Sequence, residues 1–459
     1  MKKYYEHVVE NNFFSSIILY LLVSTLFLHF LKATYIEYFI LLASFFLVAL
    51  LYNPNRLFYF NSQTKIFRSS VILFFFLIIL VSVWSFNFYN YPLEKGYVDT
   101  FDMLNGIMRM SVMPLTCICL YLLINHRDQY IRILKIYLTF IILAAVSMIV
   151  QQFIGHIPLF GIVGPPRFAG LMPYPSIAGN ITVFPAITGI ALLLLISKVP
   201  YKLNLFYKTI LILLVIIAGF LTLQKAAFVN VGLGFALGFF LLTFKEIYIY
   251  LIFSIIISII IYFIFPDLFL SIFSLISNTT GIEILDNTIH RGIYEPIYVK
   301  FFDRMLAGNW RIEPLSSLEF FAGYGVIGGT DMFGFKFNTS PHLTDSIHNP
   351  NGFALGALHN MYFQLYQIGG IFLPTIFILV LILAIINLYR TFHNHQDYLA
   401  LILCMCNINF LINCIVHNGA LFHPYISFTF WLSIAYLVGP HSINASHKGI
   451  NDIKVKQSL

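Results

Sequence analysis

The sequence predicts an all-α, polytopic membrane protein with about twelve transmembrane helices and one large loop on the outer side of the membrane. Of its 459 residues, 59% are hydrophobic and only 10% are charged, whereas soluble domains are about one quarter charged. Apolar runs of roughly 17 to 25 residues recur along the chain, and each is long enough to cross a hydrocarbon core about 30 Å thick. The interval from Phe265 to Leu358 is the long stretch that lacks such a run.

The apolar runs set the expected order of elements. A membrane domain of residues 1–264 carries the first nine spans, and residues 265–358 form the large loop. Residues 359–438 form a second membrane domain with the last three spans, and a polar tail covers 439–459. The first run lacks a small-residue cleavage pattern, so we expect it to remain as a span. The expected spans are 13–31, 36–52, 70–86, 104–124, 133–154, 179–197, 207–223, 226–243, 247–264, 360–388, 398–416 and 425–438.

The distribution of basic residues predicts the orientation. Lys and Arg collect in cytoplasmic loops of membrane proteins, so the net charge of +7 is read as a topology signal and no nucleic-acid partner is expected. With the N-terminus inside, most of the 26 Lys and Arg residues fall in short cytoplasmic segments. Both termini are therefore expected in the cytoplasm and the large loop outside.

Topology does not explain the cations that remain on the outer side, so they need another explanation. Arg167 lies in a loop rich in Pro and Gly (GPPRFAGLMPYPSIAGN), Lys225 in a tight hairpin (LTLQKAAF) and Arg291 in the large loop (IHRGIYEP), while Arg109 lies near the outer end of the fourth span. A lipid diphosphate at headgroup level would be bound by such groups, because Arg binds phosphate bidentately and Lys binds it as a point charge. Anchoring to anionic headgroups, snorkelling of Arg109 and ion pairs with acids of the large loop are the alternatives.

His359-Asn360 is a second candidate, at the point where the large loop re-enters the membrane. An imidazole near a helix N-terminus is favoured in its neutral form, which a general base requires. A structural hydrogen-bonding histidine is the alternative reading. No metal or cofactor is expected, because the first outer loop offers only Glu37 as an acidic ligand and the five cysteines lie in apolar runs without zinc-site spacing.

Several of these segments resemble those of the bacterial O-antigen polymerases and O-antigen ligases. Arg167-Phe-Ala-Gly170 with Pro175 resembles an Arg-x-x-Gly…Pro element of the family, and Arg291-Gly-Ile-Tyr-Glu resembles the start of its large periplasmic loop. His359-Asn360…Gly369-Gly370 resembles the His-Asn…Gly signature that closes that loop. In LTLQKAAF, Lys225 stands where the family usually has arginine, keeping the charge but losing the planar fork.

The resemblance implies a C-type glycosyltransferase fold in the bacterial inner membrane. It implies an O-antigen, capsular or exopolysaccharide polymerase whose donor and acceptor are undecaprenyl-diphosphate-linked oligosaccharides, with a chain-length regulator protein as a further partner. Arg167, Arg291 and Lys225 would hold the diphosphate, His359 would act on the acceptor hydroxyl, and Arg109 and Asn360 would support them. Membrane lipids are the remaining expected partners.

Two other functions stay open from the sequence. A ligase of the same family would transfer the glycan to lipid A core, and the sequence separates it poorly from a polymerase. A flippase or secondary transporter would place ionisable residues near the membrane midplane, commonly in repeated halves. This chain has few charges within spans and no visible repeat, which favours the glycosyltransferase.

Overall fold

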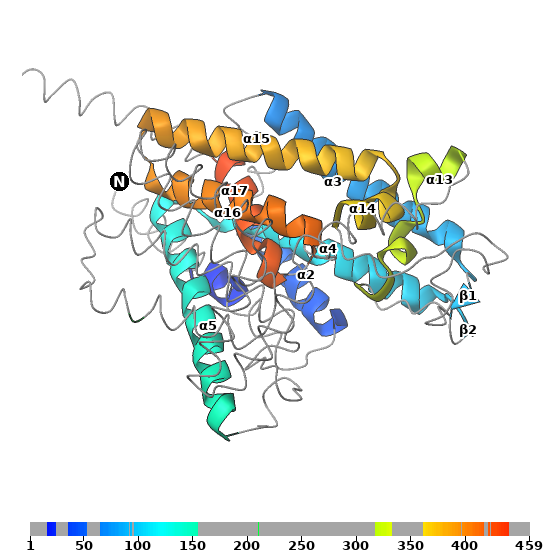
Figure 1. Cartoon of the computed structure of the whole chain (residues 1–459), viewed down its shortest axis with the longest axis horizontal. Helices are drawn as coiled ribbons and strands as arrows, with labels where there is room; N and C mark the ends of the chain where they lie inside the picture. Colours follow the sequence, from blue (N-terminus) through cyan, green and yellow to red (C-terminus); the bar gives the residue numbers. More distant parts are fainter. Residues whose placement is uncertain are drawn as a thin grey trace, which may run out of the picture. The chain divides into compact units, whose positions relative to one another are not determined.

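The described part of the chain is almost entirely helical (Figure 1). The computed structural model describes residues 16–23, 35–52, 65–90, 92–93, 96–154, 210, 317–332, 361–395, 397–416, 421–422 and 424–439. Its strands are β1 (Pro92–Leu93) and β2 (Gly96–Tyr97), which pair antiparallel in a short hairpin. The helices are α2 (Tyr35–Tyr52), α3 (Lys65–Trp84), η3 (Ser85–Phe88), α4 (Thr100–Leu123), α5 (Arg127–Ile154), α13 (Ser317–Ala322), η4 (Gly325–Met332), α14 (Met361–Gly369), α15 (Phe372–His395), α16 (Tyr398–Val416) and α17 (Pro424–Val438).

Three described helices are long and apolar enough to cross a membrane. They cover Lys65–Phe88, Thr100–Leu123 and Phe372–His395, each of 24 residues, or about 36 Å at the usual helical rise. Shorter apolar helices occur at Leu42–Leu51, Tyr398–Leu411 and Ile426–Val438. The prediction of a helical membrane protein is confirmed at this level. The spans expected between 179 and 264 lie outside the described residues, apart from Ile210.

Helices α2, α16 and α17 lie within a residue of the expected spans 36–52, 398–416 and 425–438. Helix α5 begins at Arg127, earlier than the expected span at 133, because its first turn is charged and hydropathy marks only the apolar part of a helix. For the same reason α3 begins at Lys65 rather than at residue 70.

The prediction of a single tenth span over 360–388 is wrong, because the structure has two helices in this stretch. Helix α14 ends at Gly369, and Gly370 follows with φ of +61°, a conformation that favours glycine. Helix α15 then begins at Phe372. The amide of Gly370 donates to the carbonyl of Tyr366 (2.9 Å), so the end of α14 is closed by the turn that breaks the span.

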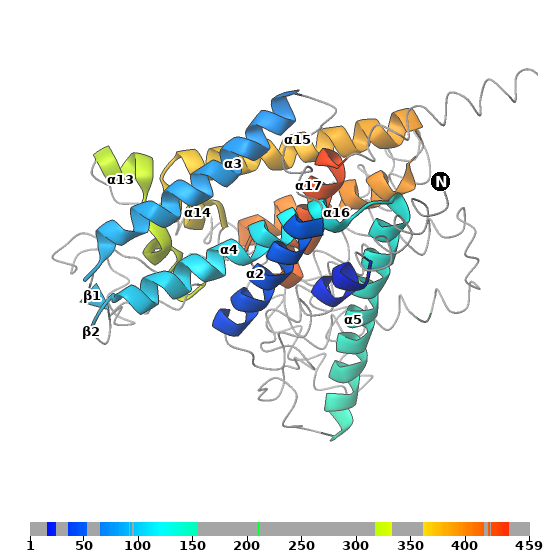
Figure 2. The ribbon, with the colours of Figure 1, turned by 180° about the vertical axis from the view of Figure 1, so that it is seen from behind.

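Helices α3 and α4 form an antiparallel pair joined through η3 and the β1–β2 hairpin (Figures 1 and 2). Asp99 caps α4, since its carboxylate accepts from the amide of Asp102 (2.7 Å) and the carboxylate of Asp102 accepts in return from the amide of Asp99 (3.4 Å). This reciprocal capping box satisfies backbone donors that the first helical turn leaves open. It fixes where α4 begins.

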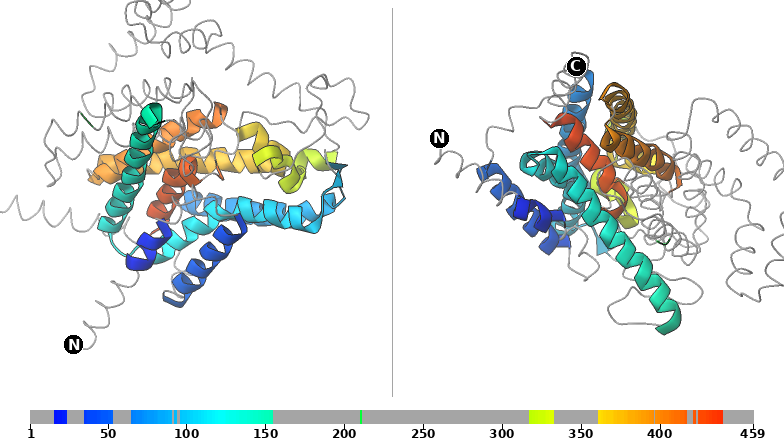
Figure 3. Two further views of the ribbon diagram at one scale, coloured as in Figure 1. Left: turned by 90° about the horizontal axis from the view of Figure 1, so that it is seen from below. Right: turned by 90° about the vertical axis from the view of Figure 1, so that its left-hand side faces the viewer.

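An aromatic cluster holds four helices together. Helix α17 packs against α4 on one side and α16 on the other, and α15 packs against α3 and α16 (Figure 3). At their meeting point the rings of Phe74, Phe377, Phe410, Phe430 and Trp431 are fully buried. Their centroids lie 5.2 to 6.2 Å apart, within the range of favourable aromatic pairs.

The chain divides into two compact units. One comprises Met1–Thr139 with Arg304–Leu459, and the other comprises Phe140–Asp303. The contacts described below all lie within the first unit. The expected boundaries at 264, 358 and 438 stay predictions, and residues 440–459 of the expected tail lie outside the described residues.

Candidate functional site

Most residues of the predicted site lie outside the described part of the chain. These are the candidate base and its neighbour, His359 and Asn360, and the candidate diphosphate ligands Arg167, Lys225 and Arg291. Their proximity to one another therefore stays a prediction. Helix α14 begins at Met361, directly after the His359-Asn360 pair in the sequence.

Arg109 is the one predicted site residue that the structure describes. It lies in α4, nine residues after the start of that helix at Thr100, or roughly 13 Å along the axis. It lies deeper in the helix than expected, because the apolar run starts at 104 whereas the helix begins at Thr100. The residue is partly buried and its Nε atom is enclosed by protein.

The end of α3 binds a segment of the large loop, and we call this contact the α3–η4 junction, formed by Trp84, Ser85, Gly323 and Val326. The indole Nε1 of Trp84 donates to the carbonyl of Gly323 (2.9 Å). The Ser85 hydroxyl donates to the carbonyl of Val81 (2.6 Å) and accepts from the amide of Val326 (2.9 Å). Side chains of a membrane-spanning helix thus satisfy backbone groups of the loop.

Helix α14 binds the same loop segment from the other side. The amide of Tyr324 donates to the carbonyl of Gln367 (2.7 Å), and the Gln364 side chain donates to the carbonyl of Gly328. Gly323 leaves no room for a side chain here, since a Cβ would lie 2.6 Å from the amide nitrogens of Gly369 and Gly370. The glycines therefore allow the two backbones to approach closely.

Gln364 is a residue that sequence reasoning missed. Its side chain is fully buried, and within the described part of the chain its Oε1 atom has no hydrogen-bond partner. An open acceptor in a buried setting is unusual, because an unsatisfied polar atom is costly. Gln364 follows the predicted His359-Asn360 pair by about one helical turn in the sequence, so it is a candidate to support that pair. A glutamine inside an apolar run was the available signal.

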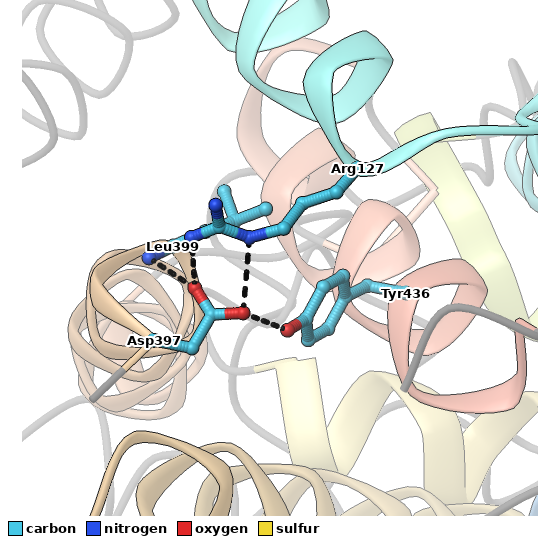
Figure 4. A network of polar contacts seen from close by, with 4 residues as sticks. All are labelled: Arg127, Asp397, Leu399 and Tyr436. Atoms are coloured by element: carbon cyan, nitrogen blue, oxygen red, sulfur yellow. Dashed lines mark hydrogen bonds and ion pairs between the residues drawn. The ribbon is translucent and has the colours of Figure 1, made fainter. Parts of the chain in front are cut away.

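A charged network joins the start of α5, the start of α16 and the end of α17 (Figure 4). The guanidinium of Arg127 donates to both oxygens of Asp397, with Nη2–Oδ1 at 2.6 Å and Nε–Oδ2 at 3.2 Å. The Tyr436 hydroxyl donates to Oδ2 (2.7 Å), and the amide of Leu399 donates to Oδ1 (2.9 Å). We call these four residues the Asp397 clamp.

The Asp397 clamp is a structural element rather than a reactive one. Burial alone would raise the pKa of Asp397, but the hydrogen bonds and positive charge of Arg127 outweigh it and lower that pKa. The carboxylate also precedes α16, where a helix N-terminus favours negative charge. All its acceptor sites are used by protein, so it has no free capacity for proton transfer to a ligand. From the sequence, Arg127 was only one of the basic residues in the short segments expected in the cytoplasm.

Metal ligands and reactive thiols are not grouped in the described residues. Within that part of the chain, no set of three or more His, Cys, Asp or Glu side chains could hold a metal ion. The cysteines are all buried and form no disulfide with one another (Cys117, Cys119, Cys404, Cys406 and Cys414), and they lie inside apolar helices as expected.

Comparison with known proteins adds no family. No family model, no curated protein and no solved structure matches the chain. The class that the structure defines is that of a helical protein with membrane-spanning helices.

Proposed function

We propose that this protein is a membrane glycosyltransferase that polymerises lipid-linked oligosaccharides at the outer face of the bacterial inner membrane. The observation that carries the proposal is the position of Arg167, Lys225 and Arg291 in segments expected outside. Outer-face cations run against the usual charge distribution of membrane proteins. A bound diphosphate gives them a function.

The described helices support this proposal by their direction. The end of α3 and the loop segment 317–332 meet at the α3–η4 junction, and the Gln364 side chain of α14 contacts the same segment. This is the end that the charge distribution predicts to be outside. The Asp397 clamp, which includes the first residue of α5, is at the end predicted to be cytoplasmic. The loop segment 317–332 and α14, which follows His359-Asn360 in the sequence, are thus neighbours, and this supports a site built from both.

In the proposed reaction the acceptor hydroxyl attacks the anomeric carbon of the donor sugar. The new glycosidic C–O bond forms as the bond to the lipid diphosphate breaks, and His359 takes the hydroxyl proton. Arg167, Arg291 and Lys225 neutralise the charge that grows on the departing diphosphate. Arg109 and Asn360 would support these groups. Because the cations supply this stabilisation, we expect no metal or other cofactor.

The proposal is tested by replacing Arg167, Arg291 and His359 singly with alanine in the native host and comparing surface polysaccharide ladders. Each variant is expected to shorten the ladder strongly, toward a single repeat unit. Arg304→Ala and Arg311→Ala are matched controls in the same large loop, because we expect these arginines to be solvated or paired. Ladders of normal length from all three site variants, in protein that still reaches the membrane, would overturn the assignment.

A deletion strain separates the polymerase from the ligase. Loss of a polymerase leaves a single repeat unit on the surface, whereas loss of a ligase leaves bare lipid A core and lipid-linked polymer inside. Loss of a flippase would leave lipid-linked single repeats at the cytoplasmic face. We expect the first of these three phenotypes.

A further inference from the structure

The loop segment 317–332 is built into the end of the helix bundle. Residues 323–329 are buried, and four of their backbone groups have protein partners. These are the carbonyls of Gly323 and Gly328 and the amides of Tyr324 and Val326. Irregular backbone is tolerated at membrane depth when it is enclosed by protein in this way. These contacts fix the segment against the end of α3 and against α14.

Helix α13, which opens this segment, exposes apolar side chains. Leu318, Phe320 and Phe321 are 60%, 41% and 49% exposed. The helix is nevertheless held in place, because the amide of Ile371 donates to the carbonyl of Phe320 (2.9 Å) and the ring of Phe321 stacks on Phe372 at 5.8 Å. A fixed patch of large apolar side chains marks an interaction site.

This patch continues the exposed apolar surface of two candidate membrane-spanning helices. Ile371 and Phe372 are themselves exposed and lead into α15, which like α3 is long and apolar enough to cross a membrane. Both helices leave large apolar side chains uncovered, such as Ile79 and Val83 on α3 and Ile382 on α15. Figures 1 and 2 both show α13 beside the start of α15. Since Glu319 also lies in α13, the headgroup boundary suits this helix better than the hydrocarbon centre.

We propose that α13 inserts Leu318, Phe320 and Phe321 into the edge of the lipid bilayer, so that this part of the large loop is a membrane-held element. The partner is the acyl-chain region of the leaflet next to the α3–η4 junction. Aromatic side chains are enriched at this boundary in membrane proteins. The inference depends on the membrane spans and stands whether or not the protein is a glycosyltransferase.

Spin labels report the environment of each position directly. Phe320→Cys and Phe321→Cys are labelled in the full chain, which is then reconstituted into phospholipid vesicles. Collision rates with oxygen, which concentrates in lipid, and with a water-soluble nickel chelate are measured. The native cysteines are buried, so the wild-type chain gives the labelling background. Ile79→Cys on α3 is the lipid-facing control, and Thr100→Cys at the start of α4 is the water-facing control on the same side.

Positions 320 and 321 are expected to give an oxygen-to-nickel collision ratio several-fold above that of position 100 and close to that of position 79. High nickel collision rates would place α13 in water and overturn the proposal. Low collision rates with both reagents would mean that other parts of the chain cover α13, and would overturn it equally. A milder pair, Leu318→Cys and Phe372→Cys, repeats the measurement if the first labels disturb folding.

Discussion

At the residue scale, the Asp397 clamp joins parts of the chain that are distant in sequence. Asp397 is 5% exposed and Arg127 is 47% exposed, so the pair lies where solvent screens one partner but not the other. A buried carboxylate that loses its cation is costly, whereas a half-exposed arginine that loses its carboxylate is solvated. Loss of Arg127 is therefore more costly than loss of the Asp397 charge.

Asp397→Asn measures the milder of these two losses. The asparagine can still cap α16 and accept from the amide of Leu399, but it loses the charge that pairs with Arg127. We expect a loss of about 1–2 kcal/mol, measured as a lower melting temperature in detergent. Asp128→Asn, an exposed acid next to the clamp, is the control and should melt like the wild type. If both variants have the same melting temperature, the charge of Asp397 does not stabilise the protein.

The lowered pKa of Asp397 gives the same clamp a pH dependence. Its folded pKa lies below the ordinary value of 3.8, so the stabilisation is fully present above pH 3.8 and is lost as the pH falls through the folded pKa. The melting difference between wild type and Asp397→Asn should stay constant from neutral pH to about pH 4 and shrink only below it. A difference that already shrinks near pH 6 would contradict this assignment.

At the element scale, the break between α14 and α15 depends on a glycine in the left-handed region. Gly370→Ala combines an unfavourable φ of +61° with a Cβ that would collide with the Phe321 backbone. We expect less folded, monodisperse protein and separation of α13 from the start of α15. Ile371→Ala changes the adjacent exposed residue and should be close to neutral. Size-exclusion chromatography in detergent compares the two, and a well-folded Gly370→Ala protein would show that the turn can shift.

Hydropathy predicted the elements well where a helix lies wholly within one apolar run, as in α16 and α17. Hydropathy failed at α14 and α15, because the glycine turn lies inside an apolar run and does not lower the mean hydropathy of that run. The burial of residues 323–329 was also missed, since its cause is pairing with Trp84, Ser85 and Gln367 far away in the sequence. The composition of a short segment does not predict contacts with residues that are distant in the sequence.

At the scale of the whole molecule, the start of α5, the start of α16 and the end of α17 meet at the Asp397 clamp, so these three helix ends lie together. The charge distribution predicts that this side is cytoplasmic. For the candidate site, the sequence supplied residue types and order, but no local pattern fixes the distances among Arg167, Arg291 and His359. Among the described residues, the structure adds Gln364, which follows the His359-Asn360 pair closely in the sequence.

The orientation is tested with topology reporters. A fluorescent protein fused after Leu459 should fluoresce, because it folds in the cytoplasm. Alkaline phosphatase inserted in the large loop after Ser340 should be active, because it requires the outer compartment. The same enzyme inserted after His126, in the turn between α4 and α5, should be inactive and serves as the control. The reverse pattern would place the predicted site on the wrong side for its substrate.

The most direct measurement of the central claim uses purified protein in lipid vesicles with a lipid-diphosphate-linked repeat unit from its host. The account predicts a ladder of longer lipid-linked products with EDTA present, and no ladder from His359→Ala. Absence of elongation by well-folded wild-type protein, or elongation that EDTA abolishes and magnesium restores, would contradict it.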